Sequence, residues 1–160
     1  MAGDKRSTTF TFLAEPGDVN FGGKVHGGAV MKWIDQVSYA CASGWSRRYC
    51  VTVYVGGIRF FKPIQIGHEV KLEAKIIYTG SSSMHISVDV SSAPLWEDKY
   101  LKNTHCIIIF VALDQDSNKV DVPKWIPETE DDIALEQYAI RLMERRKLIE
   151  DEMLPFLGKE

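Results

Sequence analysis

Residues 18–35 read DVNFGGKVHGGAVMKWID, and this stretch decides how the chain folds. A glycine-rich turn runs directly into a helix predicted over residues 27–43. The apolar positions of that helix fall on one face of a 3.6-residue period; they are Val30, Trp33, Ile34, Val37, Ala40 and Cys41. One carboxylate, Asp35, lies off this stripe, on a side shared with Gly28 and Met31. The stretch therefore predicts a largely buried helix with bare backbone at its start and one acid further along.

On both sides of this helix the hydrophobic pattern has the period of two that is typical of strands. Strands are predicted over residues 8–13, 49–61, 68–80, 84–92 and 104–113. The run at 104–113 is apolar on both faces, which predicts a central strand. A second, highly charged helix is predicted from about residue 130 to 151, and Gly44 is expected to cap the first helix.

This order predicts an α+β protein, in which the last four strands form an antiparallel meander. The first helix is too apolar to lie half in water, so we expect the sheet to wrap it. The chain is predicted to be one domain over 1–160, with flexible ends at 1–7 and 152–160. Open sheet edges are a liability unless they are paired or covered, and we therefore expect at least a homodimer.

Composition excludes several classes of protein. The net charge of −3 disfavours nucleic-acid binding, which needs clustered Lys and Arg. No apolar run is long enough to span a membrane, and residues 1–15 lack the apolar core of a signal peptide. The three cysteines, Cys41, Cys50 and Cys106, lie far apart among apolar neighbours, which predicts reduced thiols in a cytoplasmic protein. With no Cys-x-x-Cys pair, no metal site is predicted.

Four short motifs occur in order along the chain. The first joins Asn20, the pair Gly27-Gly28 seven residues on, and Asp35 eight residues after Gly27. The second is Phe-Phe-Lys-Pro at 60–63 followed by Gly67, and the third is Gly-Ser-Ser-Ser at 80–83. The fourth is the basic run Arg-Arg-Lys at 145–147.

Together these motifs resemble the acyl-CoA thioesterases of the hotdog-fold superfamily, in which an antiparallel sheet wraps one long central helix. The resemblance covers residues 8–149. One feature departs from the acyl-CoA hydrolase branch, which usually has Phe-Gly-Gly where this chain has His26-Gly27-Gly28. His-Gly-Gly is more typical of the phenylacetyl-CoA and hydroxybenzoyl-CoA thioesterase branches, so the motifs leave open the acyl group that is preferred.

The resemblance implies a hydrolase of lipid metabolism that cleaves acyl-CoA to a carboxylic acid and coenzyme A without a further cofactor. Unpaired N–H groups at a helix start can stabilise an oxyanion, and Gly27 and Gly28 leave room for a carbonyl to approach. Asp35 is predicted to activate water or to attack the thioester itself. Asn20 is predicted to orient the water or hold the carbonyl, with a turn-forming role as the alternative. As the resemblance implies, Asn20 and Asp35 of one site come from different subunits.

Coenzyme A carries phosphate charges that a mildly acidic protein must meet locally. The predicted contacts are Lys62, the turn Ser81, Ser82 and Ser83, and the pair Arg145 and Arg146. The arginines could equally form a solvated helix face, and the serines a simple hairpin turn. His26 is interpreted as shaping its loop rather than as a base.

Two other functions fit the same class of fold. A non-catalytic acyl-CoA sensor would bind the thioester without cleaving it, although no segment here is long enough for the DNA-binding domain of hotdog regulators. A hydratase or dehydratase would need a His-Phe-x-Gly or an Asp-x-x-x-x-His context, and the sequence has neither. The number of subunits, whether two, four or six, is not fixed by the sequence.

Overall fold

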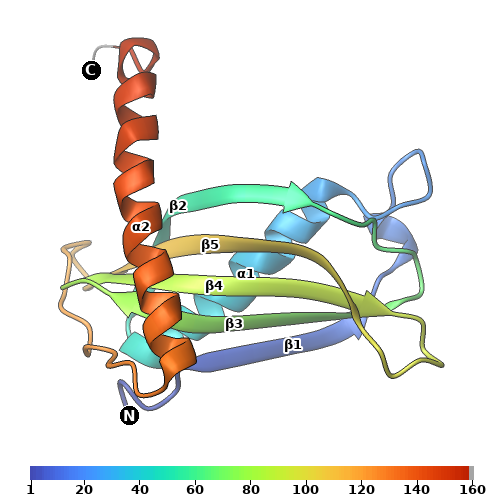
Figure 1. Cartoon of the computed structure of the whole chain (residues 1–160), viewed down its shortest axis with the longest axis horizontal. Coiled ribbons are helices and arrows are strands. Elements are labelled where there is room, and N and C mark those ends of the chain that lie inside the picture. The colour runs from blue at the N-terminus through green and yellow to red at the C-terminus, as the bar shows by residue number, and fades with distance from the viewer. Residues whose placement is uncertain (159–160) are drawn as a thin grey trace.

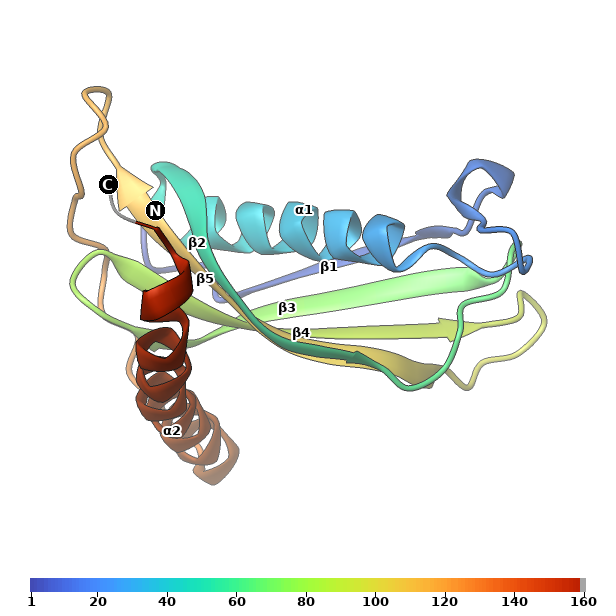
Figure 2. The ribbon, with the colours of Figure 1, turned by 90° about the horizontal axis from the view of Figure 1, so that it is seen from above.

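The computed structural model describes residues 1–158 and contains five strands and two long helices. In chain order the elements are β1 (Ser7–Leu13), η1 (Pro16–Asp18), α1 (Gly27–Ser46), β2 (Tyr49–Phe60), β3 (Glu69–Thr79), β4 (Ser83–Ala93), β5 (Leu101–Leu113), α2 (Glu130–Met153) and η2 (Leu154–Phe156). The strands form one sheet, with α1 on one face and α2 on the other (Figure 1 and Figure 2). The predicted α+β class is confirmed.

The strands pair antiparallel in the order β1-β3-β4-β5-β2. The prediction of a four-strand meander was therefore wrong, because β2 pairs with β5 and not with β3. Strand β5 is apolar on both faces and takes an interior position, which leaves β2 as the strand that covers its second edge. The register of β2 shifts between Gly56 and Arg59, next to the Gly56-Gly57 pair.

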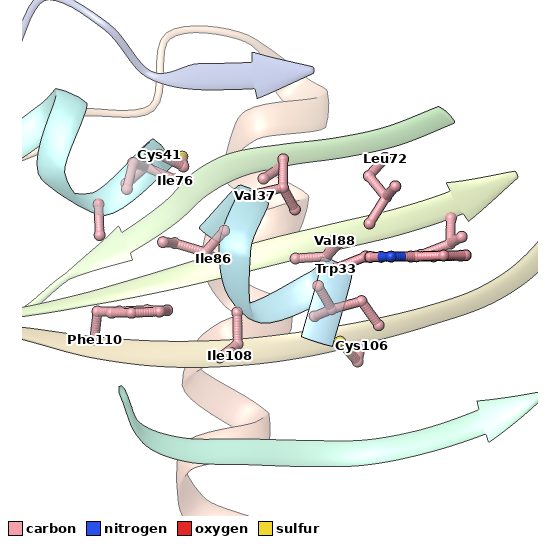
Figure 3. Packing of buried hydrophobic residues seen from close by; sticks show 14 of the residues in the cluster. Trp33, Val37, Cys41, Leu72, Ile76, Ile86, Val88, Cys106, Ile108 and Phe110 are labelled. Carbon is pink, nitrogen blue, oxygen red and sulfur yellow. The ribbon is translucent and has the colours of Figure 1, made fainter. Parts of the chain in front are cut away.

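The main core lies between α1 and the sheet (Figure 3). The stripe of α1 that includes Val30, Ile34, Val37 and Cys41 is buried, as its period predicted. The sheet covers only this side of the helix. The opposite side stays exposed in a single chain, and it carries Gly28, Met31, Lys32, Asp35, Gln36 and Tyr39.

The end of α1 differs from the prediction. The helix continues past Gly44 to Ser46, and its C-cap is Arg47, which adopts the left-handed conformation with φ of 56°. Trp45 and Ser46 are buried in this last turn, so packing extends the helix beyond the glycine.

Helix α2 packs on the other face of the sheet through a small cluster formed by Ile77, Ile107 and Ala139. The Thr129 side chain caps its first turn by accepting a hydrogen bond from the Asp132 N–H at 3.1 Å. Arg6 also holds this end, with 2.7 Å between its Nη1 and an Asp132 carboxylate oxygen. Most of α2 is exposed, which confirms the predicted surface helix.

The predicted flexibility of the ends stays a prediction. At the N-terminus, the Gly3 N–H donates to the Trp45 carbonyl at 2.8 Å. At the other end, α2 and η2 continue to Phe156, whereas residues 159–160 lie outside the described part of the chain. Between residues 1 and 158, no helix is both long and apolar enough to cross a membrane.

The alternation along β3 yields a stability test. Leu72 is fully buried, whereas the neighbouring Glu73 is exposed and pairs only with Lys71. We expect Leu72→Ala to lower the free energy of unfolding by roughly 2–5 kcal/mol, because the cavity left behind cannot collapse fully. Glu73→Ala should change it by no more than about 0.5 kcal/mol. Urea denaturation of both variants checks the assignment of the two faces, and equal losses would contradict it.

Candidate active site

The start of α1 presents uncapped backbone amides. His26 is the N-cap residue, and its side chain makes no capping hydrogen bond to any described residue. The first turn therefore keeps N–H groups that no side-chain cap satisfies. A Cβ added to Gly28 would meet nothing within 4 Å, and one added to Gly27 would lie 3.4 Å from the Phe60 ring. The backbone at the helix start is thus open to a small group placed against it.

The loop that leads into α1 is organised by Asn20. Its Oδ1 accepts hydrogen bonds from the N–H groups of Gly22 at 2.9 Å and Lys24 at 3.2 Å. In the single chain, Asn20 therefore has the turn-forming role that was the alternative at this position. It also lines a cavity of about 360 Å³, and Gly27 and Lys62 are part of the same cavity wall. The fold thus brings together three of the predicted site residues.

Asp35 lies outside this cavity. It follows Gly27 by eight residues, which corresponds to about 12 Å along the helix axis. Its carboxylate is exposed in the single chain and accepts a hydrogen bond from the Thr52 hydroxyl, with 2.6 Å between the oxygens. The structure therefore places Asp35 on the side of α1 that the sheet leaves uncovered, as its helical position predicted.

Sequence reasoning missed Thr52. The residue lies on β2 and has no motif around it, and its partner Asp35 is 17 residues away on a different element. Only the docking of β2 beside α1 brings the two side chains together. A threonine within an outward-facing strand segment is common, so no local signal could have identified it.

Apolar side chains surround this exposed acid. Met31 and Tyr39 lie four residues to either side of Asp35 on the helix, and both are exposed. The neighbouring strand β2 adds exposed Val53 and Val55, and β2 is also an edge of the sheet. An uncovered sheet edge beside an exposed apolar surface is typical of an association surface.

The other predicted coenzyme A contacts lie elsewhere on the chain. Ser83 pairs with Val111 on β5, whereas Phe60, next to the Lys62 segment, pairs with Thr104. Seven residues of strand separate these positions, which is roughly 23 Å. Arg145 and Arg146 are on α2, on the face of the sheet opposite α1. Within one chain, the fold does not bring the serine turn or the arginines to Lys62.

Several ionisable groups outside this site have shifted pKa values. Burial raises the pKa of the Cys41 and Cys106 thiols to about 12, which makes both poor nucleophiles. All three cysteines are buried and free, as expected of core thiols. Burial also raises the pKa of Asp89, but hydrogen bonds from His105 and Lys102 outweigh this and lower it overall. Within residues 1–158, no cluster of three His, Cys, Asp or Glu side chains could hold a metal ion.

Comparison with known proteins identifies the family to which this chain is similar. The family model described as the thioesterase superfamily matches residues 22–95, which include Gly27, Asp35 and Thr52. The relative named uncharacterized acyl-CoA thioester hydrolase YkhA, from Bacillus subtilis, is 33% identical over 132 residues, covering 82% of this chain and 77% of the relative.

Solved structures are similar over most of the chain. The acyl-CoA hydrolase from Bacillus cereus superposes with a TM-score of 0.88 at 28% identity, over 99% of this chain and 98% of that one. The hexameric thioesterase y2039 from Yersinia pestis superposes with a TM-score of 0.67 at 30% identity, over 72% of this chain and 93% of that one. The fold and the helix-start site thus define a hotdog-fold protein of the thioesterase type. The chain belongs to the thioesterase superfamily, within its group of acyl-CoA thioester hydrolases.

Proposed function

We propose that this protein is an acyl-CoA thioesterase that hydrolyses the thioester to a carboxylic acid and free coenzyme A. The observation that carries the proposal is the geometry of α1. Gly27, at the uncapped start of the helix, lines a cavity with Asn20, and Asp35 lies on the uncovered side of the helix, held by Thr52. The family supplies the substrate class, because its members are acyl-CoA thioester hydrolases.

In the proposed mechanism, Asp35 removes a proton from water as the water oxygen bonds to the thioester carbon. The carbonyl oxygen becomes an oxyanion, which the Gly27 N–H and, beside it, the Gly28 N–H stabilise with the positive end of the helix dipole. The carbon–sulfur bond then breaks, and the proton held by Asp35 passes to the sulfur of coenzyme A. Direct attack of Asp35 on the carbonyl would instead form an anhydride that water later cleaves. Thr52 orients the carboxylate in either route.

The two halves of this site require a second copy of the chain. About 12 Å of helix separates Gly27 from Asp35, which is too far for both to touch one carbonyl. Pairing of β2 with its counterpart would cover the sheet edge and the apolar surface around Asp35, and would place two α1 helices side by side. We therefore propose a homodimer in which Gly27 and Asn20 of one subunit face Asp35 of the other. The hexameric state of the Yersinia pestis thioesterase supports a larger assembly of such dimers.

For the coenzyme A moiety, Lys62 is the proposed phosphate contact from within the chain, because it lines the cavity with Gly27. Ser81, Ser82, Ser83, Arg145 and Arg146 remain proposed contacts that would reach the ligand only from a neighbouring subunit. A cytoplasmic location also remains a proposal, and it rests on the three free thiols.

Replacing Asp35 tests the proposed base. We expect Asp35→Ala to fold and bind coenzyme A but to lose roughly 100- to 10,000-fold in kcat, because water activation is lost. Thiol release from a panel of acyl-CoA substrates measures this loss. The matched control is Gln36→Ala, its exposed neighbour on α1, which should retain full turnover. Turnover by Asp35→Ala at the wild-type rate would remove Asp35 from the mechanism, and tight binding without thiol release by the wild type would indicate a sensor.

Thr52 has its own test. Thr52→Val keeps the shape of the side chain but removes the hydroxyl that holds Asp35, so we expect kcat to fall by roughly tenfold with little change in KM. Thr52→Ser restores the hydroxyl and should recover most of the lost rate. Equal kcat values for the valine and serine variants would show that the hydrogen bond does not position the carboxylate.

A further inference from the structure

Helix α2 lies on the face of the sheet opposite α1 (Figure 2). A second cavity is lined by residues of α2 and of the strands β2, β4 and β5. Its volume is about 220 Å³. Most of its wall is apolar, with Ile107 and Ile109 from β5 and Leu142 from α2. The Asn20–Gly27 cavity lies at the start of α1, so the two cavities share no lining residue.

His85 supplies a buried polar group to this cavity. The residue is 3% exposed and packs edge-on against Tyr78, with 4.9 Å between the ring centroids. Burial, with a smaller contribution from the Arg146 charge, lowers its pKa to about 4, so the ring is neutral at pH 7 and carries one N–H. The ring lines the cavity, so a ligand placed there could accept a hydrogen bond from its N–H.

Arg146 brings a cation to the same cavity. Its guanidinium lies over the Tyr54 ring, 5.1 Å from the centroid, and is close enough to act on the charge of His85. Its Nε is buried and makes no hydrogen bond within residues 1–158, because the Glu150 carboxylate, 3.5 Å away, does not meet hydrogen-bond geometry. A buried guanidinium nitrogen without a hydrogen bond to the described residues, on a side chain that forms an ion pair with Glu150, therefore lines the cavity together with the His85 ring.

Two other polar side chains of this wall, His105 and Tyr138, already have hydrogen-bond partners. His105 lies between Asp89 and Tyr138, with its Nδ1 2.9 Å from the carboxylate and its Nε2 3.0 Å from the phenol oxygen. This network occupies His105 and Tyr138, so we assign the ligand contacts to His85 and Arg146. An apolar cavity of about 150 Å³ accommodates benzene, so about 220 Å³ has room for one ring with a short acidic group. It is too small for the adenine and phosphates of coenzyme A.

We propose that this cavity binds a monocarboxylate with a compact apolar body, such as an aromatic ring. The carboxylate would accept hydrogen bonds from the His85 N–H and the Arg146 guanidinium, and the body would lie against Ile107 and Leu142. The proposal concerns a cavity other than the Asn20–Gly27 cavity, and it assigns Arg146 to this ligand rather than to coenzyme A.

The test is a titration of the full-length protein with benzoate, followed by NMR of protein labelled at its histidine rings. We expect saturable shifts of the His85 ring signals with benzoate and none with benzyl alcohol, which has the same ring but no charge. His85→Phe and Arg146→Met should each weaken benzoate binding, measured by calorimetry, by at least about tenfold, because each removes one charge-assisted hydrogen bond. Far-UV circular dichroism checks that both variants are folded.

Arg141→Met is the matched control, since Arg141 is an exposed arginine of the same helix that does not line the cavity. It should bind benzoate as the wild type does. The proposal is wrong if benzoate leaves the His85 signals unchanged, or if Arg146→Met and Arg141→Met bind it equally well. It is also wrong if coenzyme A shifts these signals and benzoate does not, because the cavity would then belong to the nucleotide.

Discussion

The contact between the apolar stripe of α1 and the sheet determines the rest of the molecule. Burying Ile34 and Val37 against the strands fixes the rotation of the helix about its axis. Once that rotation is set, Asp35 must lie off the buried stripe, on the side of the helix next to the edge strand β2. The same contact fixes the start of the helix at Gly27, beside Phe60 and the loop held by Asn20. A core-packing interaction thus positions both an acid and a set of amides without using either in the core.

The cost of this arrangement is an exposed surface that a single chain cannot cover. Asp35 lies between exposed Met31 and Tyr39, next to the unpaired edge of β2. A second copy that pairs along β2 would exclude water from this surface, and a carboxylate works better as a base where water is scarce. Association and catalysis therefore depend on the same residues in the proposed dimer. The cavity beside α2 shares no lining residue with the Asn20–Gly27 cavity, although β2 contributes Tyr54 to its wall.

Much of the fold could be predicted from the sequence, because periodicity reports burial directly. The stripe of α1 and the two-faced burial of β5 both followed from residue spacing. The pairing of β2 could not be predicted, since chain order suggests β3 as its neighbour and only tertiary packing selects β5. The end of α1 was misplaced for a similar reason, because burial of Trp45 outweighs the preference of Gly44 for a cap.

The positions of Gly27 and Asp35 could be predicted, because both belong to a short motif and both lie on a helix that the sequence predicts. That of Thr52 could not, because its role depends on a contact between two elements. The wide separation of the serine turn, the arginines and Lys62 also depends on topology, which spacing along the chain does not report.

The central claim is that two chains complete one site, and a mixing experiment tests it most directly. Gly27→Pro removes the proposed oxyanion N–H at a helix position that tolerates proline, and Asp35→Ala removes the acid, so each protein alone should be inactive. After the two are unfolded and refolded together in equal amounts, half of the dimers would combine one chain of each kind. Each such dimer has one intact site, and the account predicts thiol release at about one quarter of the wild-type rate. A mixture that stays as inactive as its two components would show that each site lies within one chain.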